Sequence, residues 1–223
     1  MKTFVIGDIH GCFEQLQELL EVINLDLRKD RLIMLGDYID RGPNSYLTLL
    51  KVIKLQKEFG DQHVILLRGN HEQMALDYLQ NPSYRSNWRY NGGDSTLADF
   101  QKHGDDLANY EGFLQGLPCY FEDEHFVYVH GGIRQGIRLS QQKASDLLWI
   151  RDEFFRNPAS EKKPVIFGHT PTRSITGTWK PFIQQNRIGI DTGCIYGGFL
   201  SAVVIEEGVI KEIRQVGNNS SAA

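Results

Sequence analysis

Short apolar runs that end at glycine-bounded polar motifs recur along the first third of this chain. The runs Thr3–Ile6, Arg31–Leu35 and His63–Leu67 are rich in β-branched and aliphatic residues, which predicts three buried strands. A helical pattern follows each run, over residues 45–59 and 70–79 in the second and third cases. In the first case the i, i+3, i+4, i+7 stripe consists of Leu16, Leu19, Leu20 and Ile23. A repeated strand–motif–helix unit predicts a parallel or mixed sheet with the motifs at its carboxyl edge.

The pattern changes after residue 80. Residues 81–118 mix aromatic, glycine and polar positions with only short helical stripes, so we expect a helical insertion there. Short apolar runs separated by turn signals then predict a second sheet, more antiparallel than the first. These runs are residues 120–121, 126–129, 165–167, 187–190, 200–205 and 209–213.

This organisation predicts one catalytic domain over residues 1–216, of α/β (α+β) class. The small and polar residues 217–223 are expected to form a flexible tail. A chain of 223 residues is long enough to bury a substantial core, and its 41% hydrophobic and 23% charged residues are ordinary globular values.

The charge and the cysteines restrict the class of partner. A net charge of −4 argues against sequence-independent binding to a nucleic-acid backbone, which favours a basic face. Three scattered cysteines do not form a disulfide framework, so we expect reduced thiols and a cytoplasmic protein. No apolar stretch reaches the 18 residues that would suggest a membrane span, and no membrane partner is expected.

Five motifs carry the candidate chemistry, and the first two supply carboxylates. Asp8 and His10 lie two apart at a strand end, where alternate residues point the same way, so both can reach one metal ion. Asp37 arrives by the same geometry from the next strand, and its two oxygens make it the best candidate to bridge two ions. Asp40 and Arg41 follow within the same motif.

The other three motifs supply an amide and three histidines. Asn70 offers a neutral oxygen to a metal, while the adjacent His71 diverges and keeps a proton available as a general acid. Asp40 is the natural partner to hold the His71 ring. His130 and His169 each end an apolar strand beside glycine, which indicates ligands of a second ion.

Read together, the motifs resemble those of the phosphoprotein-phosphatase branch of the calcineurin-like metallophosphoesterases. The blocks Gly7-Asp8-Ile9-His10-Gly11, Gly36-Asp37-Tyr38-Ile39-Asp40-Arg41-Gly42 and Gly69-Asn70-His71-Glu72 match that signature, and two separate histidines follow them. In particular the chain is similar to the small bacterial and phage serine/threonine protein phosphatases.

The resemblance implies a fold of two packed mixed β-sheets flanked by helices, a four-layer sandwich. It implies a first metal on Asp8, His10 and Asp37, and a second on Asp37, Asn70, His130 and His169. A metal-bridging hydroxide would then attack phosphorus in line, without a phosphoenzyme. Arg41 would contact the phosphoryl oxygens, and His71, supported by Asp40, would protonate the leaving oxygen. Arg151, which follows Leu147-Leu148-Trp149-Ile150, matches a second phosphate-binding arginine, although it could instead pair with a neighbouring acid.

Three further positions are less certain from sequence. Asn91, in the aromatic insertion with Trp88 and Tyr90, indicates a substrate-side loop, and Tyr196 is expected to lean over the site; both could equally be turn or packing residues. Arg68 could support the site electrostatically or only brace its motif.

The leading function is therefore a metal-dependent phosphatase for phosphoserine and phosphothreonine proteins or peptides, with phosphotyrosine as a further candidate. The alternative is a symmetrical diadenosine tetraphosphate hydrolase, which would need a base-stacking pocket near residues 81–118. Two divalent ions are expected, with Mn²⁺ as the ion for assays in vitro; iron and zinc also accept this donor set. No obligatory regulatory subunit is evident.

Overall fold

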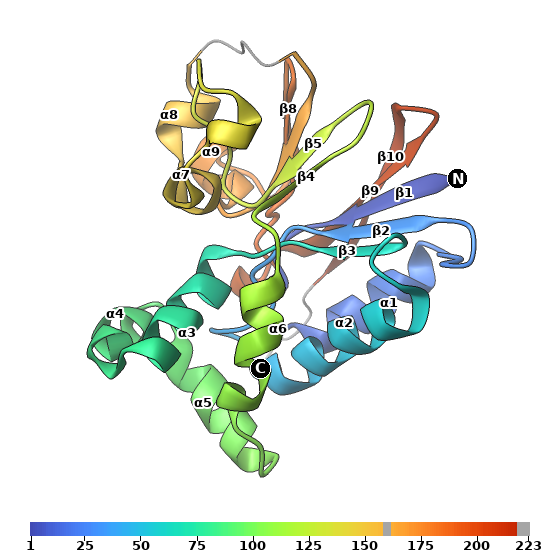
Figure 1. Cartoon of the computed structure of the whole chain (residues 1–223). Helices are drawn as coiled ribbons and strands as arrows, with labels where there is room; N and C mark the ends of the chain where they lie inside the picture. The colour runs from blue at the N-terminus through green and yellow to red at the C-terminus, as the bar shows by residue number, and fades with distance from the viewer. Residues whose placement is uncertain (158–161, 218–223) are drawn as a thin grey trace.

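Two five-stranded β-sheets lie against each other in the middle of the molecule, and helices cover their outer faces (Figure 1). The computed structural model describes residues 1–157 and 162–217. The first sheet has the order β10-β9-β1-β2-β3 and the second has the order β4-β5-β6-β8-β7. Their strands are β1 (Lys2–Ile6), β2 (Arg31–Met34), β3 (Val64–Leu66), β9 (Phe199–Glu206) and β10 (Val209–Gly217), then β4 (Tyr120–Glu122), β5 (Val127–Val129), β6 (Val165–Phe167), β7 (Phe182–Gln184) and β8 (Arg187–Gly189).

The expected pair of mixed sheets is confirmed, but one detail of the prediction is wrong. The runs predicted over residues 200–205 and 209–213 do not join the second sheet, because β9 pairs antiparallel with β1 and carries β10 at its other edge. Each sheet contains two parallel and two antiparallel pairings, so the second sheet is no more antiparallel than the first.

Alternate side chains along the strands of the first sheet pack into two different hydrophobic cores. In β1, Phe4 and Ile6 face the helices α1 and α2, while Val5 faces the second sheet. Both faces are therefore apolar, as expected for central strands that are covered on each side. The outer face of the second sheet packs Val129 and Phe167 against Phe154 of α8. Four layers result, with the sheet–sheet interface in the centre.

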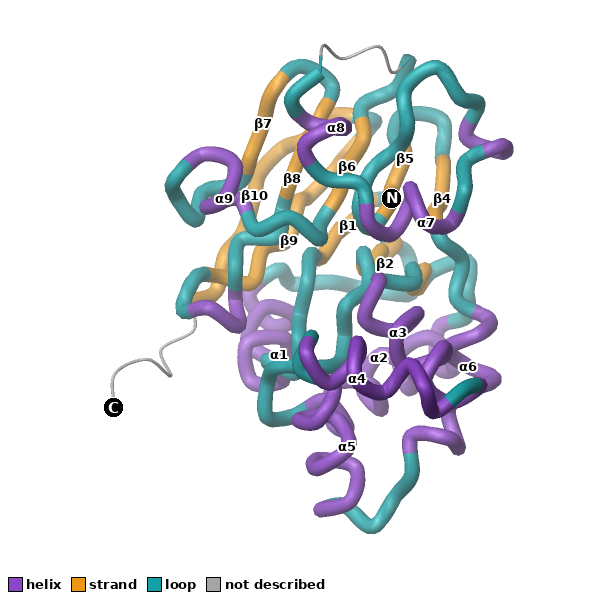
Figure 2. The backbone as a smooth tube through the Cα atoms, turned by 90° about the vertical axis from the view of Figure 1, so that its left-hand side faces the viewer, coloured by secondary structure: helices purple, strands orange, loops and turns teal. Residues whose placement is uncertain are grey.

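The helices fall into groups that follow the layers (Figures 1 and 2). Helices α1 and α2 cover the first sheet, and α7, α8 and α9 lie beside the second. Helices α3 to α6 gather at one end, and α4 to α6 belong to residues 81–118, where the sequence pattern predicts a helical insertion. The helices are α1 (Phe13–Val22), α2 (Ser45–Phe59), α3 (Asn70–Gln80), α4 (Arg85–Tyr90), α5 (Gly93–Lys102), α6 (Glu111–Gly116), α7 (Ala144–Trp149), α8 (Asp152–Phe155) and α9 (Thr172–Thr176), with 3₁₀ turns η1 (Pro82–Tyr84), η2 (Leu107–Tyr110), η3 (Leu139–Gln141) and η4 (Cys194–Tyr196).

Two predictions concern the chain's environment and its end. Within residues 1–157 and 162–217, no helix is long and apolar enough to cross a membrane. The predicted tail begins at Gly217, which is the last residue of β10; residues 218–223 lie outside the described part.

Candidate metal-dependent active site

The candidate site lies where strands of both sheets end at their carboxyl edges. Asp8 and His10 follow β1, Asp37 follows β2 and Asn70 opens α3 after β3. His130 directly follows β5, and His169 lies two residues after β6, in the second sheet. These six side chains are all at most 5% exposed. The six predicted metal ligands therefore come together from five segments that are distant in sequence.

The backbone at the site adopts conformations that side chains usually avoid. Eight non-glycine residues of the described chain have positive φ, and five of them were predicted as site residues. Left-handed backbone of this kind costs energy and persists only where the surrounding structure imposes it, as at functional sites. The five are His10 (φ 49°), Asp37 (φ 54°), Asp40 (φ 71°), Arg41 (φ 69°) and His169 (φ 63°).

Motif glycines allow the carboxylates to approach neighbouring backbone. A Cβ atom on Gly168 would lie 2.1 Å from Oδ1 of Asp8, and a Cβ atom on Gly69 would lie 2.1 Å from Oδ1 of Asp37. Both distances are far below van der Waals contact, so a side chain at either position would push a carboxylate out of place. The glycines in these motifs thus make room for the candidate ligands.

One oxygen of Asp37 lies at the centre of the site. Its Oδ2 is 3.4 Å from Nε2 of His10 and 3.4 Å from Nε2 of His130. Its Oδ1 instead accepts a hydrogen bond from the backbone N–H of His71 at 3.0 Å, which fixes the carboxylate. Donor atoms separated by 3 to 4 Å are spaced as ligands around a common cation are.

Asn70 joins two of the histidines. Its Oδ1 lies 2.8 Å from Nε2 of His130 and 2.8 Å from Nδ1 of His169. Asp8 approaches from the same side, where its carboxylate accepts the backbone N–H of His169 at 3.0 Å and 3.1 Å. Asn70, His130, His169 and Asp37 thus form one cluster of donors, with Asp8 and His10 beside it.

Backbone carbonyls orient two of the rings. Nδ1 of His10 donates to the carbonyl of Ile39, and Nδ1 of His130 donates to the carbonyl of Leu35, each at 2.9 Å. A ring that donates through Nδ1 presents the lone pair of Nε2, which is the arrangement expected of a metal-binding histidine. Both Nε2 atoms face Asp37.

His71 is held differently. Its Nδ1 lies 2.7 Å from Oδ2 of Asp40, and its Nε2 is buried with no hydrogen-bond partner in the described structure. Nε2 is 3.9 Å from Asp37 Oδ2, which is farther than the ring nitrogens of His10 and His130. The ring packs edge-on against His10, with centroids 4.6 Å apart. The free nitrogen of the predicted acid therefore points toward the donor cluster from its margin.

Burial and mutual repulsion disturb the ionisation of the cluster. Burial, followed by the nearby charge of Asp191, raises the pKa of Asp8 well above its usual range. Burial also opposes ionisation of Asp37, but the charges of His130 and His71 outweigh it and hold that pKa well below its usual range. Burial lowers the pKa of His130, yet Asp37 more than compensates and raises it to about 9. Such crowding of buried ionisable groups marks a functional site.

Two of the predicted arginines reach the cluster. Nη1 of Arg41 lies 2.5 Å from Nε2 of His10, which places the guanidinium directly over the donors. Nη1 of Arg151 donates to the carbonyl of His169 at 3.0 Å and lies 3.2 Å from Oγ1 of Thr170. Arg151 forms no ion pair with a carboxylate in residues 1–157 and 162–217, contrary to the alternative of pairing with an acidic neighbour. Arg68 points elsewhere, donating to Gln73 and to the carbonyl of Gln115, so it braces its motif.

The residues present fit a pair of divalent metal ions. Two groups of three donors, His10–Asp37–His71 and Asp37–His130–His169, have ligand atoms within 4.8 Å of one another. The first group contains His71 where the sequence prediction has Asp8. Asp37 is common to both, as expected of a bridging carboxylate, and Nε2 of His169 is buried without a hydrogen-bond partner among the described residues. A mixed oxygen and imidazole donor set suits manganese, iron or zinc.

Comparison with known proteins agrees with this geometry. The profile of the calcineurin-like phosphoesterases matches residues 1–197. The chain belongs to the calcineurin-like phosphoesterase family. Members of this family are enzymes that hydrolyse phosphoester bonds, and they use a dinuclear divalent metal centre.

The relatives of this phosphoesterase divide between two substrate classes. It is 33% identical to serine/threonine-protein phosphatase 1 of Salmonella typhimurium, over 92% of each chain. It is 43% identical to a symmetrical bis(5'-nucleosyl)-tetraphosphatase of Psychromonas ingrahamii, over 90% of this chain and 92% of the other. A solved structure described as a candidate diadenosine tetraphosphatase superposes with a TM-score of 0.72 at 23% identity, over 97% of this chain and 93% of that one, which establishes the fold.

The aromatic insertion of this phosphoesterase differs from the sequence prediction. Trp88 is fully buried and donates through Nε1 to Oδ2 of Asp40 at 2.7 Å. It therefore supports the Asp40–His71 pair and offers no exposed ring on which a nucleobase could stack. Tyr90 is 92% exposed. Asn91 donates to the carbonyl of Asn87 within its own turn. The insertion reaches the site through Gly92, whose carbonyl accepts the backbone N–H of Arg41.

Tyr196 does lie near the predicted phosphate-binding group. Its ring centroid is 5.8 Å from Cζ of Arg41, and half of its surface is exposed. Burial raises the pKa of its hydroxyl, although Arg41 opposes the shift. The structure thus brings Tyr196 to the rim of the site, whereas the Asn91 side chain hydrogen-bonds within its own turn.

Two acidic residues that matter to the site were missed or left without a role. Asp191 is buried, and burial raises its pKa to about 6. It follows the end of β8 just as Asp8 follows β1, so the strand-end rule could have found it. Glu72 accepts backbone N–H groups of Gly69, Asp37 and Tyr38 at 2.8 to 2.9 Å, which ties the second and third motifs together.

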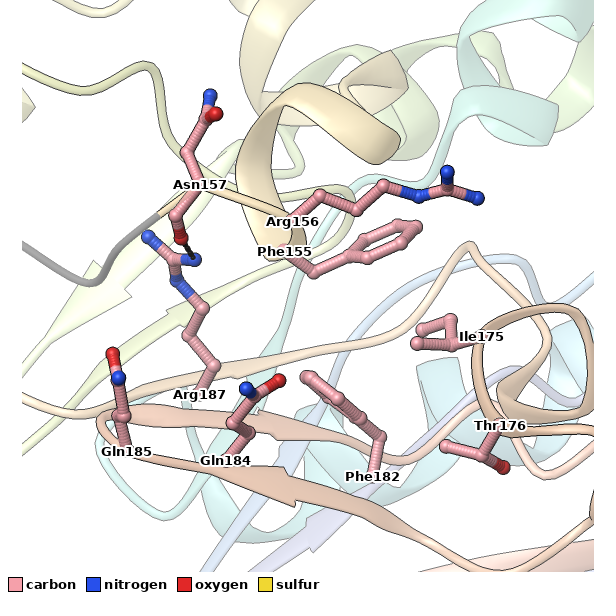
Figure 3. Close-up of a pocket in the computed structure, with 9 residues that line it drawn as sticks. All are labelled: Phe155, Arg156, Asn157, Ile175, Thr176, Phe182, Gln184, Gln185 and Arg187. Carbon is pink, nitrogen blue, oxygen red and sulfur yellow. Dashed lines mark hydrogen bonds between the residues drawn. The ribbon is translucent and has the colours of Figure 1, made fainter.

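A cavity of about 610 Å³ lies away from the candidate cluster, between α8, α9 and the strands β7 and β8 (Figure 3). Phe155, Phe182 and Ile175 form its apolar wall, and Arg187 donates to the carbonyl of Asn157 at its edge. None of the candidate site residues lines it. This cavity is therefore separate from the candidate metal-binding cluster.

Proposed function

We propose that this phosphoesterase is a two-metal phosphomonoesterase that acts on phosphoserine and phosphothreonine in proteins or peptides. Asp8, His10 and Asp37 would hold one ion, and Asp37, Asn70, His130 and His169 would hold the other. When bound, two such ions supply an activated water at neutral pH and offset charge that develops on the phosphoryl group. The spacing of the donor atoms around Asp37 supports this assignment.

Arg41 and Arg151 would bind the phosphoryl oxygens. Each guanidinium lies at the donor cluster, and neither forms an ion pair with a carboxylate in the described part of the chain. The planar fork of arginine matches two oxygens of a tetrahedral anion at once. Burial lowers the pKa of Arg151, which indicates that its charge is poorly hydrated and available to an anion. The two residues would orient the phosphorus for attack.

The free Nε2 of His71 is the single observation that carries the proposed reaction. It is buried, unpaired among the described residues and next to the donor cluster, while Nδ1 is fixed on Asp40. A nitrogen in this position would donate its proton to the departing oxygen, and Asp40 would stabilise the ring that donates it. A protein that cleaves poor leaving groups such as serine or threonine alkoxides needs this acid most.

The symmetrical hydrolysis of diadenosine tetraphosphate is the second candidate. The 43% identity with a symmetrical tetraphosphatase favours it, and the same ligands and arginines would serve that reaction. The leaving group there is a nucleotide phosphate, which departs with less help from an acid. Dependence on His71 therefore separates the two candidates.

A substrate comparison tests the proposal. Mn²⁺-loaded protein would be given a phosphothreonine peptide and diadenosine tetraphosphate side by side, with Asp37→Asn as the inactive control. Turnover of the peptide well above that of the dinucleotide supports the phosphatase, and the reverse supports the tetraphosphatase. No turnover of either, with metal bound, contradicts both.

The role of His71 has its own test. We expect His71→Asn to lower kcat about 100-fold or more on the phosphothreonine peptide, since general acids contribute about 10²- to 10⁴-fold. The loss on p-nitrophenyl phosphate should be at least tenfold smaller, because nitrophenolate leaves without a proton. Equal losses on both substrates would show that His71 holds a metal ion or the fold and is no general acid.

A further inference from the structure

Two aromatic rings, flanked by two arginines, lead outward from the proposed phosphoryl site. Cζ of Arg41 lies 5.8 Å from the ring centroid of Tyr196. The Tyr196 ring is nearly parallel to that of Trp179, at 6° between planes and 6.4 Å between centroids. Cζ of Arg173 lies 5.4 Å from the centroid of Trp179. The order is therefore cation, ring, ring, cation, beginning at the candidate catalytic centre.

The glycines of the β8–β9 loop fix the position of the second ring. A Cβ atom on Gly193 would lie 2.1 Å from Cζ3 of Trp179, and one on Gly198 would lie 3.0 Å from its Cδ2. The indole thus rests directly on glycine backbone. Gly193 also has φ +71°, a conformation that side chains rarely adopt. This loop presents Trp179 and Tyr196 as one platform.

The platform is attached to the ligand-bearing segment. Helix α9 carries Arg173 and begins three residues after His169. The backbone N–H of Thr172 in that helix donates to the carbonyl of Asp191 at 2.8 Å. Tyr196 belongs to η4, which follows Asp191 in the chain. The segments that carry Arg173 and Tyr196 are therefore connected directly to the segments that carry the candidate metal ligands.

The exposure and charge of this platform distinguish it from ordinary packing. Tyr196 is half exposed, whereas the fully buried Trp88 has its N–H paired with Asp40. Arg173 is exposed, and it has no ion pair with a carboxylate in residues 1–157 and 162–217. Flat apolar rings next to unpaired arginines favour a ligand that joins an aromatic ring to several negative charges. A nucleoside polyphosphate supplies both in one molecule, while a phosphopeptide supplies a single phosphate.

We propose that Trp179 and Tyr196, flanked by Arg41 and Arg173, form a nucleobase-binding subsite through which the enzyme also takes nucleoside polyphosphates. The inference rests on the proposed phosphoryl site at Arg41. The rings begin one side chain beyond that arginine. The subsite lies on the β8–β9 loop and α9, away from the 81–118 insertion where sequence analysis had placed a base pocket.

A binding experiment without catalysis tests the subsite directly. In EDTA, where turnover is blocked, ATP and inorganic tripolyphosphate would be titrated while tryptophan fluorescence is followed. The two ligands differ by the nucleoside. We expect ATP to quench the fluorescence and to bind about tenfold more tightly than tripolyphosphate, because one base stacked on an aromatic side chain contributes on this scale. Equal affinities for both ligands in the unmodified protein would overturn the proposal.

Variants assign the effect to the rings. Trp179→Leu and, separately, Tyr196→Leu should each lower the affinity for ATP about fivefold to tenfold. The affinity for ATP should then approach the affinity for tripolyphosphate. Tyr90→Leu is the matched control, because it removes a tyrosine that is 92% exposed and has no ring partner in the described structure. If Tyr90→Leu weakens ATP as much as Tyr196→Leu does, stacking at this platform is excluded. Melting temperatures of the variants show whether each is folded.

Kinetics with Mn²⁺ separate this proposal from the function on which it rests. The ratio of kcat/KM for diadenosine tetraphosphate to that for p-nitrophenyl phosphate should fall about tenfold in Trp179→Leu, mainly through KM. An unchanged ratio, with both substrates turned over, contradicts the subsite alone. Loss of all activity in the unmodified, metal-loaded protein contradicts the proposed phosphoesterase chemistry, and the ATP titration in EDTA still decides the subsite.

Discussion

Asp40 is fixed by donors from three separate segments. Oγ1 of Thr96 donates to its Oδ1 at 2.6 Å, Nε1 of Trp88 donates to its Oδ2 at 2.7 Å, and His71 contacts the same Oδ2. The carboxylate is 0% exposed, so water cannot replace a donor that is lost. A buried polar group left unsatisfied costs about 1–3 kcal/mol. The position of His71 therefore depends on residues that never touch a substrate.

Thr96→Val removes one of these donors with almost no change in shape. We expect the free energy of unfolding to fall by about 1–3 kcal/mol. We also expect a reduced kcat on phosphothreonine peptide, because Asp40 and with it His71 become less ordered. Denaturant unfolding and kinetics measure the two effects. Thr96→Ser keeps the hydroxyl and serves as the control; a Ser variant as damaged as the Val variant would contradict the role given to the hydrogen bond.

The residues of the donor cluster were easier to predict than their supports. Asp8, Asp37 and His130 each follow a short apolar run, and the carboxyl ends of parallel strands meet at one sheet edge. Thr96 and Trp88 meet Asp40 across 56 and 48 residues of chain, and nothing in the local pattern of either residue indicates that contact. The sequence therefore leaves Trp88 open as a ring for base stacking, whereas the structure buries it. Hydrogen bonds of such long range depend on tertiary packing and leave no periodic signal.

At the scale of elements, Arg134 joins two helices on either side of Arg151. Its Nε and Nη2 bind the two carboxylate oxygens of Asp146 in α7 at 3.0 Å and 2.7 Å, and its Nη1 contacts Glu153 in α8. Arg151 lies in the two-residue link between these helices. Hydrogen bonding to Arg134 holds the pKa of Asp146 below its ordinary value. The clamp keeps the link in place, and with it Arg151, the second arginine proposed to bind phosphate.

Arg134→Met tests this positioning role. We expect KM for phosphomonoesters and the inhibition constant for inorganic phosphate to rise about threefold to tenfold, with kcat nearly unchanged, since a weakened clamp costs on the order of 1 kcal/mol of binding. Arg138→Met is the matched control, because Arg138 lies in the same loop, is exposed and forms no ion pair in the described part of the chain. A rise in KM of the same size in both variants would point to general surface charge.

The arrangement of elements was predictable only where the pattern was long. The three strand–motif–helix units were found because their helices have 10 to 15 residues and clear stripes. Strands of three residues such as β5 and β6 are too short to show which sheet or partner they choose. β9 joins β1 across almost the whole chain, and sequence order gives no sign of that pairing. Pairing of this range is decided by the packing of both sheets together.

At the scale of the whole molecule, the buried polar residues of the site destabilise the metal-free fold. Six polar candidate ligands are at most 5% exposed. Burial raises the pKa of Asp8, and the charge of Asp191 raises it further. Burial likewise raises the pKa of Asp191, with a further rise from the charge of Asp37. These residues join segments from β1 to β8, so the penalty falls on the contact between the two sheets. A cation that binds only the folded state would offset it.

Metal removal should therefore change global stability as well as activity. At a free Mn²⁺ concentration 100 times Kd we expect a gain of about 2.7 kcal/mol. For a chain of this length that corresponds to a melting temperature about 5–10 °C higher than in EDTA. Asp37→Asn, which removes the shared carboxylate oxygen, should lose most of this increase, while Tyr90→Leu should keep it. Identical melting temperatures of the unmodified protein in Mn²⁺ and in EDTA would mean that these six residues do not hold the ion. The size of the shift measures how far the fold depends on its metals, because a cation that binds only the folded state stabilises the whole folded chain by mass action.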